Sequence, residues 1–232
     1  MKKFKQWLAK IVFTQGRIEA SKIKKAEPAK IDDLFRAAYK KFSSAASFDA
    51  DNAEVLHYWG SVLYEQSQYK EGKEVKELCQ GACEKFGAAL KLDPNNAEIM
   101  NDWGAALISR ARNRPDKHAV PFYREAWEKI NAAEALKPGV GAYNLACIYS
   151  LQGDLRQSKM YIEQARAADN LPPVAYLKMD RDLDNIRDEE WFKHIIQSLI
   201  KEEEIQSQVR EAEKKQQNKP WWRRLKRQKS LS

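Results

Sequence analysis

The sequence predicts an all-α repeat protein, a solenoid of antiparallel helix pairs. One observation is a phrase that returns at nearly equal intervals: AEVLHYWGSVLYEQSQY from Ala53, AEIMNDWGAALISRARN from Ala97 and, more loosely, GAYNLACIYSLQGDL from Gly141. A small residue recurs in it at Gly60, Gly104 and Ala146, at intervals of 44 and then 42 residues. The other observation is composition, since 9 Gly and 8 Pro in 232 residues leave few helix breakers. Units that repeat at this scale bury their apolar faces by stacking on neighbours.

Apolar residues at helical spacing mark the elements in order. A first helix is expected over residues 31–47, followed by pairs that begin at Ala53 and Ala97 and a shorter pair near Gly141. The turns after the two longer pairs hold residues that end helices, in Asp93-Pro94-Asn95-Asn96 and Lys137-Pro138-Gly139. A last helix is expected from about residue 188. Its apolar start would cap the solenoid, and its continuation over 201–217 is polar.

Charge is distributed unevenly along the chain. The formal net charge of +8 is the sum of +7 in residues 1–25, −7 in 26–213 and +8 in 214–232. We therefore expect a basic amphipathic segment (1–30), a helical repeat domain (31–200), a polar helix extension (201–217) and a basic, Trp-rich tail (218–232). The three cysteines cannot all pair, which favours a reducing compartment, cytoplasmic or organellar. No stretch approaches the roughly 18 apolar residues that cross a bilayer.

The repeat pattern resembles the tetratricopeptide repeat over about residues 31–196. The family's recurrent small residues and closing proline match Gly60 and Gly104, Ala89 and Ala133, and Pro94 and Pro138. The resemblance implies a right-handed superhelix of antiparallel helix pairs with a C-terminal capping helix. The family unit has about 34 residues, whereas the middle units here have 44, so we expect elongated hairpins.

The segment DADNAEVLHYWGSVLYEQSQY and the long helix that follows it are also similar to the plant mitochondrial import receptor of the outer membrane. This second resemblance implies binding of presequence-like peptides. A C-terminal apolar span, by which that receptor is anchored, has no counterpart in the sequence.

The tetratricopeptide resemblance implies a peptide groove walled by the first helix of each pair. At the positions of this sequence that are equivalent to the family's groove positions, the resemblance implies the groove residues Glu54, His57, Ser61, Tyr64, Glu98, Asn101, Ala105, Ile108, Tyr143 and Cys147. The family's carboxylate clamp of Lys, Arg and Asn is not expected, because Glu54, His57 and Glu98 occupy such positions. A mildly acidic groove suits a basic or amphipathic peptide helix. The alternative is that these positions are merely solvated.

No residue pattern points to catalysis, a metal or a cofactor. Cys79 and Cys83 are four residues apart on one helix, a spacing that zinc can use, but no second Cys or His pair accompanies them. The three histidines are isolated, and no phosphate loop or nucleophile motif occurs. We therefore expect a protein that is not an enzyme.

Both ends combine apolar or aromatic residues with cations, the composition of membrane-surface segments. The expected membrane contacts are Phe4, Trp7, Leu8, Ile11 and Val12 at one end and Trp221, Trp222, Arg223 and Arg224 at the other. Two alternatives stay open: the ends bind RNA or DNA through phosphates and base stacking, or they have neither role.

The sequence therefore predicts a protein- or peptide-binding scaffold or adaptor, held peripherally on an anionic membrane by its ends. The alternatives are a soluble assembly factor or chaperone that acts through the groove alone, and an RNA-binding accessory protein.

Overall fold

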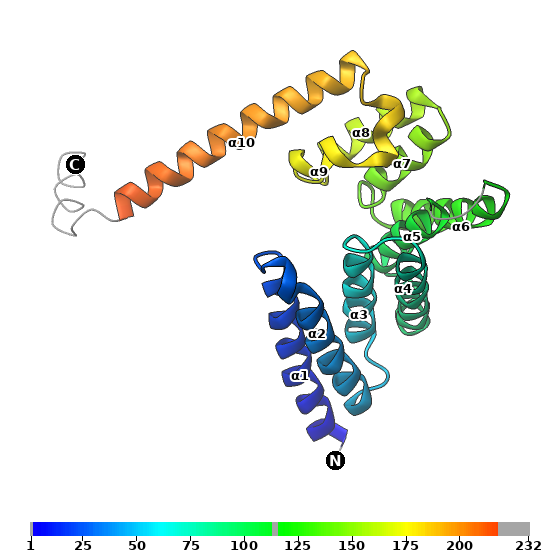
Figure 1. Ribbon diagram of the computed structural model, residues 1–232, viewed down its shortest axis with the longest axis vertical. Helices are drawn as coiled ribbons and strands as arrows, with labels where there is room; N and C mark the ends of the chain where they lie inside the picture. Colours follow the sequence, from blue (N-terminus) through cyan, green and yellow to red (C-terminus); the bar gives the residue numbers. More distant parts are fainter. Residues whose placement is uncertain (1, 113–115, 218–232) are drawn as a thin grey trace. The chain divides into compact units, whose positions relative to one another are not determined.

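The computed structural model describes residues 2–112 and 116–217, and throughout these ranges the regular structure is helical (Figure 1). Helices adjacent in the chain pack as pairs, so the predicted all-α solenoid is confirmed. The chain divides into two compact units, Met1–Leu171 and Pro172–Ser232. None of the helices in the described ranges has the length and hydropathy of a bilayer-spanning segment.

The first unit contains eight helices in four successive pairs. They are α1 (Lys2–Ile23) with α2 (Pro28–Phe48), α3 (Ala53–Ser67) with α4 (Lys73–Leu92), α5 (Ala97–Arg112) with α6 (Asp116–Leu136), and α7 (Ala142–Leu151) with α8 (Leu155–Ala167). In each pair we call the first helix A and the second helix B. The A helices are thus α1, α3, α5 and α7, the last of which is the shortest.

The turns before α3 and α5 share an Asp and an Asn at positions 44 residues apart. Asn52 Oδ1 accepts a hydrogen bond from the backbone N–H of Val55 (3.2 Å), and Asn96 Oδ1 accepts one from that of Ile99 (3.1 Å). The Asn96 amide in turn donates to Asp93 at 2.7 Å. An Asn at this position satisfies a backbone N–H that the first helical turn leaves without a partner, so these residues set where each A helix begins.

A small residue on each A helix allows the B helix of its own pair to approach closely. Gly60 lies against the ring of Phe86, and Gly104 lies against the side chain of Ile130, 26 residues further along the chain in both cases. Gly16 of α1 lies in the same way against Phe42 of α2. The first pair is therefore a repeat unit in the same 44-residue register, with α1 as its A helix.

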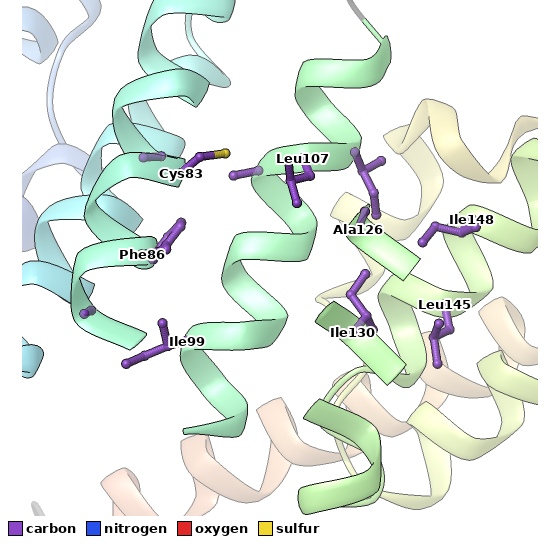
Figure 2. Close-up of a cluster of buried hydrophobic side chains, with 12 residues drawn as sticks. Cys83, Phe86, Ile99, Leu107, Ala126, Ile130, Leu145 and Ile148 are labelled. Carbon is purple, nitrogen blue, oxygen red and sulfur yellow. The ribbon is translucent and has the colours of Figure 1, made fainter. Parts of the chain in front are cut away.

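Two apolar clusters of described residues belong to the core of the first unit. The N-terminal cluster joins α1, α2 and α3 through Phe13, Phe35, Phe42, Val55 and Val62. The second cluster runs from α4 to α7, and Figure 2 shows Cys83 and Phe86 of α4 facing Leu107 and Ile99 of α5, with Ile130 of α6 beside Leu145 of α7. Each pair thus buries its apolar face against the next.

The second unit contains α9 (Val174–Met179), the 3₁₀ helix η1 (Arg181–Ile186) and α10 (Glu190–Gln217). Arg187 ties the turn together, since its guanidinium donates to the carbonyls of Lys178 and Asp180 and to the carboxylate of Asp184. Phe192, Ile195 and Ile196 at the start of α10 are buried, whereas the side chains of residues 201–215 are exposed.

Candidate functional site

Polar side chains join successive A helices of the first unit into one wall. His57 Nε2 lies 2.8 Å from Asp102 Oδ2, and Ser61 Oγ donates to the same oxygen at 3.2 Å, which connects α3 to α5. The Asn144 amide donates to Asn101 Oδ1 at 2.8 Å, which connects α7 to α5. Three of the predicted groove residues are therefore held in place by bonds between repeats, and such bonds preorganise the surface that they line.

The ten predicted groove residues differ in exposure. Glu54 and Glu98 are exposed, and His57, Ser61, Tyr64, Asn101 and Ala105 are half-buried. Ile108, Tyr143 and Cys147 are buried, and Ile108 belongs to the second core cluster. The accessible part of the wall is thus the face of α3 and α5 that carries the first seven residues, which we call the A-helix wall.

The A-helix wall is mildly acidic. Lys137 Nζ lies 2.6 Å from Glu98 Oε1, and this hydrogen bond lowers the pKa of Glu98. Glu54 carries a second carboxylate on the exposed surface. A surface of this charge attracts a cationic partner and repels an anionic one.

Helix α1 has two opposite apolar faces. One face, with Ala9, Phe13, Gly16 and Ile23, is buried in the first pair. The other is exposed and contains Phe4 (62% exposed), Trp7 (57%), Ile11 (37%) and Ile18 (51%), which we call the N-terminal stripe. The rings of Phe4 and Trp7 stack with centroids 5.8 Å apart.

The repeat register explains why the stripe is apolar. Ile11 and Ile18 correspond to Val55 and Val62 of α3, which are buried against α2 in the N-terminal cluster. In α1 the same positions are exposed. Of the predicted membrane contacts, Leu8 and Val12 are half-buried, with Val12 packed on that cluster. Trp221, Trp222, Arg223 and Arg224 lie outside the described residues.

The cysteines of α4 are packing residues in this structure. Cys79 and Cys83 are buried, and burial raises the pKa of Cys83 to about 12 because the thiolate is poorly solvated there. Zinc and nucleophilic chemistry both need the thiolate. The environment of Cys83 thus disfavours both.

A further surface was not predicted from the sequence. A cleft of about 630 Å³ opens between α6 and α7, lined by Val120, Tyr123, Arg124, Trp127, Ile148, Tyr149, Leu151 and Gln152. We call it the α6–α7 cleft. Trp127 Nε1 donates to Tyr149 Oη at 3.3 Å, and Tyr149 stacks on Tyr161 with centroids 5.4 Å apart. The available signal in the sequence was that Tyr123 and Trp127 stand where the preceding unit has Cys79 and Cys83.

The fold and these surfaces define a helical-repeat protein with exposed apolar and charged surfaces. The model of the family described as plant-specific mitochondrial import receptor subunit TOM20 matches residues 30–152, which is more than half of the chain. The chain belongs to this family, and the predicted resemblance to the plant receptor is confirmed. The match begins in α2 and ends just after α7. No curated protein matches the chain.

Proposed function

We propose that the chain is a non-enzymatic receptor or adaptor that binds a segment of another protein on the A-helix wall. The family is described as an import receptor subunit, which implies a protein-binding role. The observation that carries the proposal is the wall itself: His57, Ser61 and Asn101 are fixed by bonds between repeats, and Glu54 is exposed beside them.

The chemistry of the wall favours a basic, amphipathic helix as the bound segment. The carboxylate of Glu54 attracts its cationic face, whereas Glu98 is already paired with Lys137. The half-buried ring of Tyr64 offers apolar contact. Helices of this type commonly bind in grooves between other helices, with apolar residues as anchors. Of the predicted groove residues, the accessible seven form this site.

Fluorescence anisotropy with a labelled, basic amphipathic peptide tests the proposal. Glu54→Lys should weaken binding about tenfold, which equals about 1.4 kcal/mol. Glu84→Lys makes the same charge change on the exposed surface of α4, a B helix, and is the matched control that should bind like the wild type. Equal affinities of all three proteins would contradict the role of the wall.

We propose a second role for the N-terminal stripe, peripheral attachment to an anionic membrane. The supporting observation is that Phe4, Trp7, Ile11 and Ile18 are exposed together on a helix whose exposed cations include Lys3, Lys10 and Arg17. Apolar residues insert between headgroups while cations meet anionic lipid, at about 1 kcal/mol for each basic residue near the surface. The basic tail, with Trp221, Trp222, Arg223 and Arg224, would add a second weak contact. The family description suggests an organellar membrane.

Point variants test the attachment better than a deletion, because Ala9, Phe13 and Ile23 of α1 are part of the core. Phe4→Ser/Trp7→Ser should reduce co-sedimentation with vesicles that contain anionic lipid. Ile205→Ser/Val209→Ser is the control, since it changes two exposed apolar residues of α10. Nuclease treatment separates lipid binding from RNA binding. If the control and the stripe variant co-sediment equally, the stripe is not the attachment site.

If the full chain binds the peptide but no vesicles, the chain acts as a soluble assembly factor and not as a membrane adaptor. If RNA co-purifies and the vesicle signal disappears after nuclease treatment, the basic ends bind nucleic acid instead.

A further inference from the structure

The α6–α7 cleft exists because one A helix ends early. Helix α5 continues to Arg112, eight residues past its small residue Gly104, whereas α7 ends at Leu151, five residues past Ala146. The difference is about one helical turn. The packing of α7 on α6 is accordingly less extensive than that of α5 on α4.

Two aromatic residues that line the cleft stand at positions that are buried in the preceding unit. In the 44-residue register, Tyr123 and Trp127 of α6 correspond to Cys79 and Cys83 of α4. Cys79 and Cys83 are buried, and Cys83 is in hydrogen-bond contact with the side chain of Arg110, which lies six residues past Gly104 in the turn that α7 lacks. Trp127, by contrast, is 41% exposed. A large aromatic side chain therefore lies where a longer A helix would have covered it.

We propose that the α6–α7 cleft binds a short amphipathic helix of a partner protein, which takes the place of the missing turn of α7. This inference rests on the proposed protein-binding function and adds a second site to the A-helix wall. The volume of about 630 Å³ lies within the usual range for ligand sites. The hydrogen bond between Trp127 and Tyr149, and the stacking of Tyr149 on Tyr161, hold the aromatic lining in place before binding.

Charge identifies the polar part of the partner. Arg124 is exposed, and among the described residues that line the cleft it is the charged one. A guanidinium at the edge of an apolar site pairs well with a carboxylate. The bound helix should therefore present apolar side chains to Trp127 and Val120 and an acidic residue to Arg124. This preference is opposite to that of the acidic A-helix wall, so the two sites select different segments.

The test uses two labelled peptides, an amphipathic helix with Glu beside its leucine face and the same peptide with Lys in place of Glu. The full-length chain should bind the Glu peptide, and Trp127→Ala should weaken this binding at least about tenfold. Leu136→Ala, which truncates another exposed apolar residue of α6, is the matched control and should bind normally. Arg124→Glu should lose the Glu peptide. In a Glu54→Lys background, which weakens binding on the wall, Arg124→Glu should bind the Lys peptide more tightly than Glu54→Lys alone does.

Several outcomes would overturn the proposal. They are no binding of the Glu peptide to the wild type, equal binding by Trp127→Ala, and no change of charge preference in Arg124→Glu. Helicity and thermal unfolding of each variant establish that it is folded, and Arg124→Glu alters an exposed side chain, so it stays informative even if Trp127→Ala unfolds. Glu54→Lys separates the two sites, because it should weaken the basic peptide on the wall and leave the Glu peptide in the cleft unchanged.

Discussion

Gly16 and Phe42 are in contact so close that a Cβ atom on Gly16 would lie 2.7 Å from Cε1 of the Phe42 ring. A Cβ atom on Gly60, one repeat later, would lie at the same distance from Cε1 of Phe86. The contact makes α1 part of the repeat array as well as the helix that carries the N-terminal stripe. Attachment through α1 would therefore hold the repeat array directly.

Glycines at the contacts between A and B helices should not tolerate a methyl group. At Gly104 a Cβ would lie 2.3 Å from Cγ1 of Ile130, so Gly104→Ala should lower the free energy of unfolding by about 1–3 kcal/mol. Gly81 is the control, because a Cβ there would lie 3.5 Å from Leu63, an ordinary contact. Gly81→Ala should raise stability by up to about 1 kcal/mol through helix propensity. Urea unfolding measures both, and a destabilised Gly81→Ala with a neutral Gly104→Ala would contradict the packing described.

Glu65 should make stability depend on pH. Burial raises the pKa of this α3 carboxyl above its ordinary value of 4.5, with Lys24 opposing the shift. The folded state then binds a proton more tightly than the unfolded state, so stability falls as pH rises through the unfolded pKa. Glu65→Gln should raise the free energy of unfolding by about 0.5 kcal/mol near pH 7.

The same substitution should have no effect near pH 3, where Glu65 is protonated in both the folded and the unfolded state. Thermal unfolding at the two pH values checks this. A stabilisation of equal size at both would indicate a cause other than ionisation.

The cysteines of α4 should be unreactive in the folded protein. With Cys79 and Cys83 buried and the pKa of Cys83 raised to about 12, maleimide near pH 8 should modify them only after unfolding, although that pH is close to the ordinary thiol pKa of about 8.5. Mass spectrometry after partial labelling identifies each site, and a sample in denaturant is the control. Rapid labelling of Cys83 in the native protein would mean that α4 and α5 separate readily.

Two lysines pack over tryptophans at equivalent places in successive units. Lys85 Nζ lies 3.9 Å from the ring centroid of Trp59, and Lys129 Nζ lies 4.5 Å from that of Trp103. Lys85→Met should lower the free energy of unfolding by about 0.5–1 kcal/mol through loss of the cation–π contact. Lys76→Met, on the exposed surface of the same helix and away from its last turn, should be close to neutral. Equal stability of both variants would show that the Lys85 contact contributes nothing.

The helix pairs and their turns could be predicted because local patterns determine them. Asn52 and Asn96 mark the starts of α3 and α5, and Gly60 and Gly104 mark their contacts with the B helices. Helix α1 was not predicted as an A helix, since Gln15 precedes Gly16 where the repeated phrase has tryptophan. The basic and aromatic residues at its start favoured the prediction of a segment separate from the repeats. The 26-residue spacing from Gly16 to Phe42, which equals that from Gly60 to Phe86, was the signal that α1 is an A helix.

The surfaces were harder to predict than the helices, because they depend on how neighbouring helices lie against each other. The bond between His57 and Asp102 spans 45 residues, and nothing in the local pattern pairs them. The α6–α7 cleft depends on where α7 ends relative to α6, so Trp127 looked like an ordinary core residue in an apolar stripe.

The central claim is that the chain binds a peptide on the A-helix wall while the N-terminal stripe of α1 is attached to a membrane. A recruitment assay tests this claim most directly. The labelled basic peptide is mixed with vesicles and the full chain at physiological salt, and the pellet is assayed. Because a basic amphipathic peptide also binds anionic lipid, the pelleted peptide is compared with that in vesicles alone, and the chain should raise its amount. With Phe4→Ser/Trp7→Ser the amount should stay at the level of vesicles alone, although that variant still binds the peptide in solution. If the chain pellets and adds no peptide to the pellet, wall binding and membrane attachment do not operate together, and the adaptor account is wrong.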